Sequence, residues 1–233
     1  MHWFHCPACR QLQNINGKSY HIHTKIICPS EHGIPHHRPR LFFVGILKTT
    51  LQHDFVWPLE SGCLPLDSFL TRGGPGDRRT CSQQRPSGKH SLENFNVAMT
   101  KLLAQGINPL RTPCVINLDG VHAHAMVNMV PCLTAARAGQ GGHWVTSRGR
   151  RLTSREMQAL MGIVPDKLNT SMVKVGRFHH MLGNAMAVNV LERILVRLLP
   201  AAGIVCRDAF VDLDRWATTE GQRAAASLLQ PKS

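Results

Sequence analysis

Two arginines separated by one residue, Arg38 and Arg40, have the clearest chemical potential in this sequence. A guanidinium carries a permanent charge and several N–H donors, so the pair suits a phosphate group or negative charge that develops during a reaction. On residue type alone, both arginines can equally be solvated residues of a loop. The apolar run Leu41–Leu47 follows directly and predicts that the arginines stand at the start of a strand.

A second candidate ligand site is the turn Gly183-Asn184-Ala185. Glycine lets a backbone approach a ligand closely, and a helix N-terminus presents free N–H donors. We expect a helix to start directly after Gly183 and Asn184. An asparagine that only caps this helix explains the turn equally well.

Cys6 and Cys9 have the C-x-x-C spacing of zinc ligands, and several histidines lie nearby in the sequence. A second pair at zinc-finger spacing is absent, and His21 and His23 fall on one face of an expected strand. We therefore expect no metal site.

The charge balance favours a polyanionic partner. Lys and Arg number 27 against 14 Asp and Glu, which gives a formal charge of +13. Nucleic acid is the commonest partner for such an excess, although basic proteins without one also occur. The first residues lack the apolar core of a signal peptide, and the apolar stretch 185–206 is interrupted by charges, so we expect no membrane span. Eight cysteines then indicate reduced thiols and an intracellular location, nuclear in a eukaryote and cytoplasmic in a prokaryote.

The elements that must position the arginines are two strands. A short helix over 10–17 precedes an alternating, β-rich strand over Tyr20–Cys28. The second strand, Leu41–Leu47, is continuously apolar, as in strands buried on both faces. The connection is too short for a helical crossover, so we expect an antiparallel pair.

The middle of the chain is less regular. Residues 71–90 are basic and rich in turn formers, which predicts an exposed flexible loop. A helix from Leu92 to Gln105, capped by Ser91, and a strand over Pro113–Asp119 follow.

Two further helices are expected. Thr153-x-x-Glu156 is a capping box that starts the first of them. The second has an apolar stripe from Met186 to Leu198, with Asn189, Arg193 and Arg197 on the opposite side. Beyond Pro200 the chain becomes Ala-rich and polar, and we expect it to fray.

Taken together and in order, these motifs resemble the C-terminal half of a DNA (cytosine-5)-methyltransferase. The family's Gly-x-Pro-Gln-x-Arg-x-Arg loop matches Gly33–Arg40, with His36 in place of Gln. Its Pro-x-Leu-Thr stretch matches Pro131–Thr134, and its Arg-x-Leu-Thr-x-Arg-Glu helix start matches Arg150–Glu156. Its Gly-Asn-Ala/Ser turn matches Gly183–Ala185, so the resemblance covers about residues 18–200.

The resemblance implies an α/β fold: the C-terminal part of a Rossmann-like, S-adenosylmethionine-dependent methyltransferase sheet, with a terminal antiparallel strand pair, a returning helix and a small irregular target-recognition region. Residues 1–52 would end the catalytic domain, and 53–130 would form the recognition region. Residues 131–200 would return to the catalytic domain, leaving 201–233 as a tail.

In this family a cysteine thiolate adds to C6 of a flipped-out cytosine and activates C5 for methylation by S-adenosylmethionine. The resemblance implies that Arg40 contacts the cytosine or a neighbouring phosphate, with Arg38 in support. It also implies that Gly183, Asn184 and Ala185 complete the cofactor pocket. His36 brings a pH-dependent charge where the family has Gln.

DNA is the implied partner, and a basic cluster offers contacts to its backbone, although a solvated face explains the cluster nearly as well. The cluster consists of Arg148, Arg150, Arg151 and Arg155. Glu156 lies beside it, and the capping box is enough to explain this residue.

The family's cofactor loop, Pro-Cys-Gln nucleophile and Glu-Asn-Val strand do not precede Tyr20. Cys132 lies in the later Pro-x-Leu-Thr stretch and Glu93-Asn94-Phe95 in an expected helix, so neither replaces them. We expect a truncated portion that is inactive alone. The alternatives are one half of a split enzyme, whose protein partner supplies the N-terminal half, and a non-catalytic DNA-binding or regulatory module.

Overall fold

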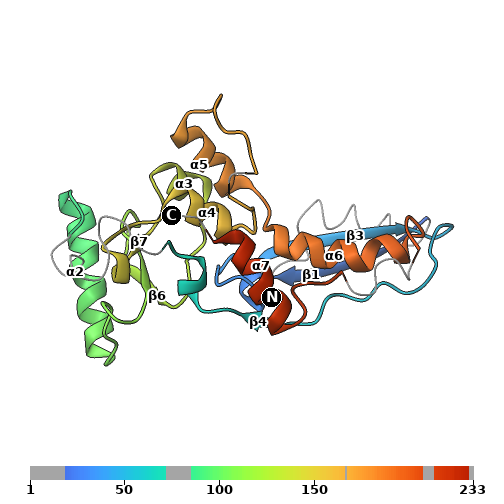
Figure 1. The fold of residues 1–233 in the computed structure, drawn as a ribbon, viewed down its shortest axis with the longest axis horizontal. Coiled ribbons are helices and arrows are strands. Elements are labelled where there is room, and N and C mark those ends of the chain that lie inside the picture. Colours follow the sequence, from blue (N-terminus) through green and yellow to red (C-terminus); the bar gives the residue numbers. More distant parts are fainter. Residues whose placement is uncertain (1–18, 72–84, 166, 207–212, 231–233) are drawn as a thin grey trace.

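The computed structural model describes residues 19–71, 85–165, 167–206 and 213–230. It is a mixed α/β structure whose elements form three groups along its long axis (Figure 1). A strand pair with one helix occupies one end, a small sheet with another helix occupies the other, and short helices fill the middle. The expected helix over 10–17, Cys6, Cys9 and most of the basic loop lie outside the described residues.

The expected strand pair is confirmed. Strands β1 (Tyr20–Ile27) and β3 (Arg40–Leu47) are antiparallel, with Tyr20 opposite Leu47 and Ile27 opposite Arg40. Arg40 is therefore the first residue of β3, and residues 28–39, which we call the arginine loop, join the two strands.

Within the described residues the second strand is buried on one face only, and not on both faces as its continuous apolar run predicted. Val44 and Ile46 are buried, whereas Leu41, Phe43 and Leu47 are 39%, 43% and 36% exposed. Helix α6 (Val188–Ala201) lies along one face of the pair, and no second layer covers the other face among the described residues (Figure 1).

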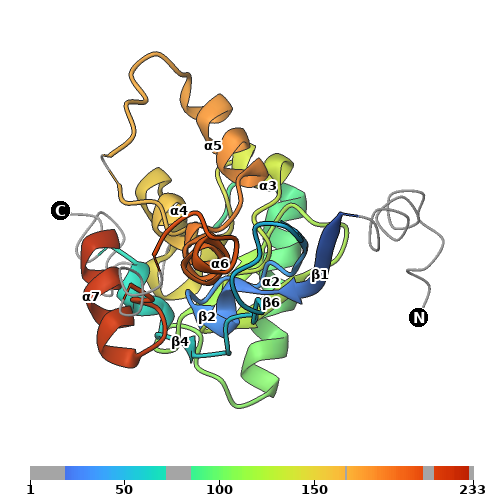
Figure 2. The ribbon, with the colours of Figure 1, turned by 90° about the vertical axis from the view of Figure 1, so that its right-hand side faces the viewer.

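Helix α6 packs its apolar side on the strands through Val190 and Ile194. Its expected polar side is not solvated, because Asn189 and Arg193 are buried. Seen along the long axis in Figure 2, α6 lies between β1 and helix α7 (Thr219–Leu229), so both of its sides have neighbours.

At the far end, α2 (Lys89–Ala104) packs on a small sheet. The helix begins three residues earlier than expected, with Gly88 rather than Ser91 as its N-cap, and Leu103 is 59% exposed. The sheet contains the expected strand β5 (Cys114–Asn117); its order is β6 (His124–Val127), β5, β7 (Trp144–Val145) and β8 (Arg150–Arg151).

The middle group contains α3 (Ala135–Gly139), α4 (Ser154–Leu160) and α5 (Val175–Asn184). The capping box of α4 is confirmed: Thr153 and Glu156 each bond the other's backbone N–H. Within the arginine loop, η2 (Pro29–Glu31) leads into β2 (His32–Gly33), which runs parallel to β4 (Gly62–Cys63). Two more short 3₁₀ turns are present: η3 (Leu66–Phe69) lies against α4 and α7, and η4 (Thr146–Arg148) lies beside β5 of the small sheet.

The expected fraying beyond Pro200 is wrong for residues 213–230. Trp216 is fully buried, and α7 places Ala225, Ala226 and Leu229 in the largest hydrophobic cluster. The alanines that suggested a weak tail are instead the small residues with which α7 packs closely. Within the described parts of the chain, no helix has the length and apolarity needed to cross a membrane.

Candidate functional site

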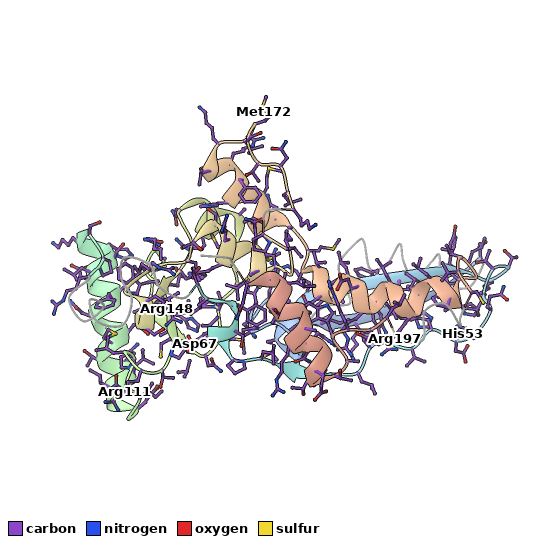
Figure 3. All side chains as sticks on the ribbon, viewed as in Figure 1. His53, Asp67, Arg111, Arg148, Met172 and Arg197 are labelled. Carbon is purple, nitrogen blue, oxygen red and sulfur yellow. The ribbon has the colours of Figure 1, made fainter. Side chains whose placement is uncertain are left out.

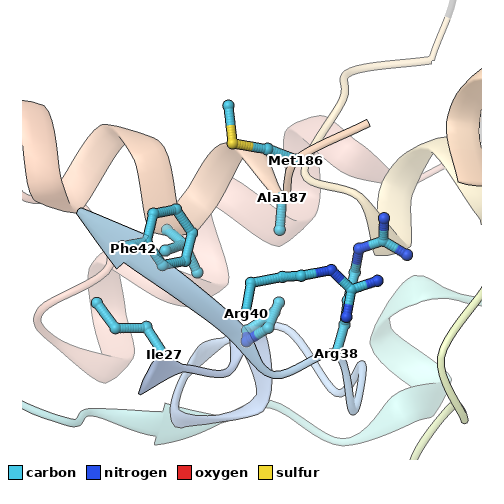
Figure 4. A pocket seen from close by; sticks show the side chains of 8 residues that line it. Ile27, Arg38, Arg40, Phe42, Met186 and Ala187 are labelled. Atoms are coloured by element: carbon cyan, nitrogen blue, oxygen red, sulfur yellow. The ribbon is translucent and has the colours of Figure 1, made fainter. Parts of the chain in front are cut away.

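The candidate site is a small cleft between the start of β3 and the start of α6 (Figure 4). Its walls are mostly apolar, and the guanidinium groups of Arg38 and Arg40 stand side by side at one end. The lining residues are Ile27, Pro29, Arg38, Arg40, Phe42, Met186, Ala187 and Val190. The cleft is small, and it places apolar walls beside fixed positive charge.

Arg38 is buried and connects three of the motifs identified in the sequence. Its Nη1 donates to the carbonyl of Leu133 at 2.6 Å, and its Nη2 donates to those of Gly183 and Ala185 at 2.9 and 2.8 Å. Burial, and then the charge of nearby Arg40, lowers the pKa of Arg38. Both terminal nitrogens of Arg38 donate inside the protein, whereas its Nε is buried and has no hydrogen-bond partner among the described residues. Arg38 therefore acts on the site through position rather than through direct contact with a ligand.

Arg40 differs from Arg38 because its side chain is exposed. It donates to its neighbouring carbonyl at Pro39, at 2.8 Å, and its Nη2 lies 3.4 Å from the sulfur of Cys132. Among the described residues no carboxylate pairs with Arg40. Its positive charge is therefore available to a ligand in the cleft.

His36 belongs to the same loop and is fully buried. Its Nδ1 lies 3.1 Å from the carbonyl of Leu160, and its Nε2 lies 3.2 Å from the backbone N–H of Leu133. Because the carbonyl can only accept, Nδ1 carries the proton and Nε2 accepts. Burial, and then the charge of Arg38, lowers the pKa of His36 to about 3. The ring is therefore neutral near pH 7, with one donor and one acceptor, as a glutamine amide would offer.

The expectation for Gly183 and Asn184 needs correction. They end helix α5 instead of starting the next helix, whose N-cap is Ala187. Gly183 is required for packing, because a Cβ there would overlap the backbone of Ala135. The backbone N–H of Ala185 donates to Met181 at 3.0 Å, so this turn lacks the free donors of a helix N-terminus.

The structure separates the four arginines of the basic cluster by their partners. Arg148 is buried beside Asp67, at 3.1 Å (Figure 3). Arg150 forms two bonds of 2.8 Å with Glu156. Arg151 bonds Asp119 at 2.8 and 2.9 Å, whereas Arg155 is exposed on α4. Arg148, Arg150 and Arg151 thus each pair with a carboxylate of the same chain.

Glu156 holds this region together. Its carboxylate accepts from the backbone N–H groups of Thr153 and Thr71, both at 2.8 Å, in addition to Arg150. Burial alone would raise the pKa of Glu156, but the bonds from Arg150, Thr153 and Thr71 hold it below its ordinary value. The residue is architectural, as its place in the capping box predicts.

Sequence reasoning missed two contributors to the cleft. Phe42 and Met186 line its apolar walls, and nothing in the sequence distinguishes them from ordinary core residues. Cys132, which we rejected as the nucleophile, has its sulfur 3.6 Å from Arg38 and 3.4 Å from Arg40. Among the residues that the structure describes, no group of His, Cys, Asp and Glu is arranged to hold a metal ion.

Comparison with known proteins gives the following matches. The model of the family described as C-5 cytosine-specific DNA methylase matches residues 8–199. The fold is similar to that of the Entamoeba histolytica methyltransferase EhMeth, with 14% identity and a TM-score of 0.49, over 82% of this chain and 57% of that one. It is also similar to the S. pombe Dnmt2 methyltransferase, with 16% identity and a TM-score of 0.46, over 84% and 64%. The chain thus spans less than two thirds of either structure, and no curated protein matches it.

Proposed function

The chain belongs to the C-5 cytosine-specific DNA methylase family, and we propose that it forms the arginine-bearing side of the active site in transfer of a methyl group to C5 of cytosine in DNA. The observation that carries this proposal is the position of Arg40, which lies at the end of an apolar cleft and pairs with no carboxylate in the part of the chain that the structure describes. A cytosine ring is flat, and its face would lie across the mouth of this small cleft.

Arg40 has the charge that this chemistry needs. When a thiolate adds to C6, the cytosine ring becomes electron-rich, and a fixed cation near O2 or N3 stabilises that charge. In this proposal Arg38 does not touch the base. It holds the arginine loop against the segments at 133 and 183–185, which keeps Arg40 at the cleft.

The methyl donor in this family is S-adenosylmethionine, and the residues described here fit it only in part. The carbonyls of Gly183 and Ala185 are used by Arg38, and the backbone donors of the turn are used by α5. Asn184 remains as an exposed side chain, with only a 3.5 Å contact to His180. We therefore assign this turn at most one edge of a cofactor pocket and derive no step through the cofactor.

The nucleophile must come from elsewhere in the assembled enzyme, because no Pro-Cys-Gln occurs in the sequence. The uncovered face of the β1–β3 pair supports the proposal that another half of the enzyme packs against this chain. Its side chains are apolar and exposed, namely Tyr20, Ile26, Leu41, Phe43 and Leu47. Contiguous exposed apolar surface of this kind typically marks an interface. We propose that this chain is inactive alone and that the half bearing the nucleophile, in the same polypeptide or in a partner, covers this face.

DNA contact is proposed for Arg40 and Arg155, the two exposed members of the sets identified in the sequence. The test is fluorescence anisotropy with a duplex that contains one mismatched, easily unstacked cytosine, measured over a salt series. Arg40→Ala should weaken binding about 5- to 10-fold and lower the salt slope by about 1. Arg177→Ala, which removes an exposed arginine of α5, is the matched control. Equal effects of both variants would refute a specific role for Arg40.

A further inference from the structure

The described C-terminal segment, residues 213–230, lies beyond the stretch matched by the family, which ends at 199. We call it the clasp. We propose that the clasp positions the arginine loop and the start of α6, and that Trp216 is its central positioning residue. This inference depends on the proposed function only in taking the cleft as the active site.

Trp216 packs against the arginine loop at Gly33. It is fully buried, and its ring lies so close to Gly33 that a Cβ there would overlap it. Gly33 has a φ of +105°, which L-residues rarely adopt. The first residue of the arginine motif is therefore fitted to the tryptophan ring both sterically and in its backbone conformation. The indole N–H of Trp216 donates to Glu192 of α6 at 2.7 Å. One side chain thus contacts both the segment that leads to the arginines and the helix whose first turn lines the cleft.

A network of polar contacts supports the same two elements. Asp214 accepts from Arg193 Nε at 3.0 and 3.1 Å, and Arg193 Nη1 donates to His32 Nδ1 at 2.6 Å. Burial, and then the charge of Arg193, lowers the pKa of His32 to about 4, so its ring is neutral and can accept this bond near pH 7. A carboxylate of the clasp is thereby connected, through a buried guanidinium, to the residue that precedes Gly33.

Gln222 forms the third contact of the clasp. Its amide donates to the carbonyl and hydroxyl of Ser61 and to the carbonyl of Trp216, each at 3.1 Å. Ser61 precedes β4, the strand that pairs with His32 and Gly33 in β2. The clasp therefore contacts the arginine loop directly, the residue before its partner strand β4, and α6. We expect a change in the clasp to alter the positions of the residues that line the cleft.

Hydrogen exchange on the full chain tests this inference. In Trp216→Ala, we expect the backbone amides of residues 34–42 to exchange at least about 10-fold faster. Two backbone bonds, from His37 N–H to the Val130 carbonyl and from Val130 N–H to the Pro35 carbonyl, join this loop to its neighbour, and they should open more often once the tryptophan ring no longer supports the loop. Exchange over Cys114–Asn117 in the distal sheet should be unchanged. Trp216→Phe should restore most of the protection, and Leu228→Ala, at an exposed position of α7, should have no effect.

Equal acceleration in both regions would overturn the proposal, because Trp216 would then only stabilise the whole fold. If Trp216→Ala does not fold, Gln222→Ala should give about a 3-fold increase confined to residues 34–42, and no increase there would refute the proposal. A second readout uses the DNA assay: Arg40→Ala should lose most of its effect when Trp216 is already replaced, whereas a full effect would count against positioning. If the parent chain fails to bind DNA, the proposed function fails, while the exchange experiment still decides the role of the clasp.

Discussion

Replacement of Arg38 tests whether the fork geometry of its guanidinium, rather than its charge, holds the site together. The three carbonyls that Arg38 bonds belong to residues 133, 183 and 185, at 2.6–2.9 Å. Hydrogen bonds from charged groups contribute about 1.5–3 kcal/mol each. The sum of about 5–9 kcal/mol is an upper bound, because burying a guanidinium without a carboxylate costs several kcal/mol.

For Arg38→Met we therefore expect a net loss of about 3 kcal/mol. A chain of this length loses about 2–4 °C of Tm per kcal/mol, so the Tm should fall by about 6–12 °C. Arg38→Lys should be no better than Arg38→Met. An ammonium is a compact point charge that cannot span the three carbonyls, yet it keeps the desolvation cost of a buried cation.

Urea denaturation and thermal melts followed by circular dichroism measure these differences. Arg177→Met, at an exposed position of α5, is the control and should stay within about 0.5 kcal/mol of the parent. A lysine variant close to the parent in stability would refute the argument from geometry. A methionine variant equal to the control would show that the three bonds contribute nothing.

Three further predictions follow from the buried charges and the uncovered face. Glu156→Gln should cost about 3 kcal/mol in the free energy of unfolding, because it leaves Arg150 without its carboxylate. Since the pKa of Glu156 is lowered when folded, its contribution is complete above about pH 4.5 and is lost as the pH falls through the folded value, so the gap between parent and variant should narrow in acid. Burial lowers the pKa of His36 to about 3 and that of His143 to about 4 in the folded protein. As the pH falls, these two histidines therefore become protonated in the unfolded chain before they do in the folded one. Melts from pH 7 to 4 should show stability decreasing below about pH 6.5, by up to about 1.4 kcal/mol per pH unit for each histidine, and a smaller slope in His36→Gln. Phe43→Ser should leave the Tm within a few degrees of the parent but reduce light scattering at high concentration, since Phe43 is 43% exposed on the uncovered face; increased aggregation would contradict this.

Local patterns in the sequence predicted the elements that carry the site. Alternation in β1 and the short connection after it were enough for the antiparallel pair, and the spacing of Thr153 and Glu156 was enough for the capping box. These features depend on neighbouring residues, so a sequence pattern contains them. The same holds for Arg38 and Arg40, which the motif placed correctly at the start of β3.

The errors arose where long-range packing decided the outcome. Asn189 and Arg193 form the polar side of α6, and both are buried against partners far away in the sequence: Asn189 donates to His32, and Arg193 donates to His32 and Asp214. Gly183 matched a motif, but its requirement for glycine comes from Ala135 on another helix. The bonds from Arg38 to 133, 183 and 185 join motifs that the sequence shows only as separate segments.

We propose that this chain supplies the arginine side of the active site and that the nucleophile comes from another part of the enzyme. The most direct test is a denaturing gel of the purified chain after incubation with a 5-fluorocytosine duplex and S-adenosylmethionine, with an active member of the family as positive control. We predict a covalent protein–DNA band for the control enzyme and none for this chain. A band that contains this chain would contradict the claim, and loss of that band in Cys132→Ser would assign the nucleophile to the residue that we rejected.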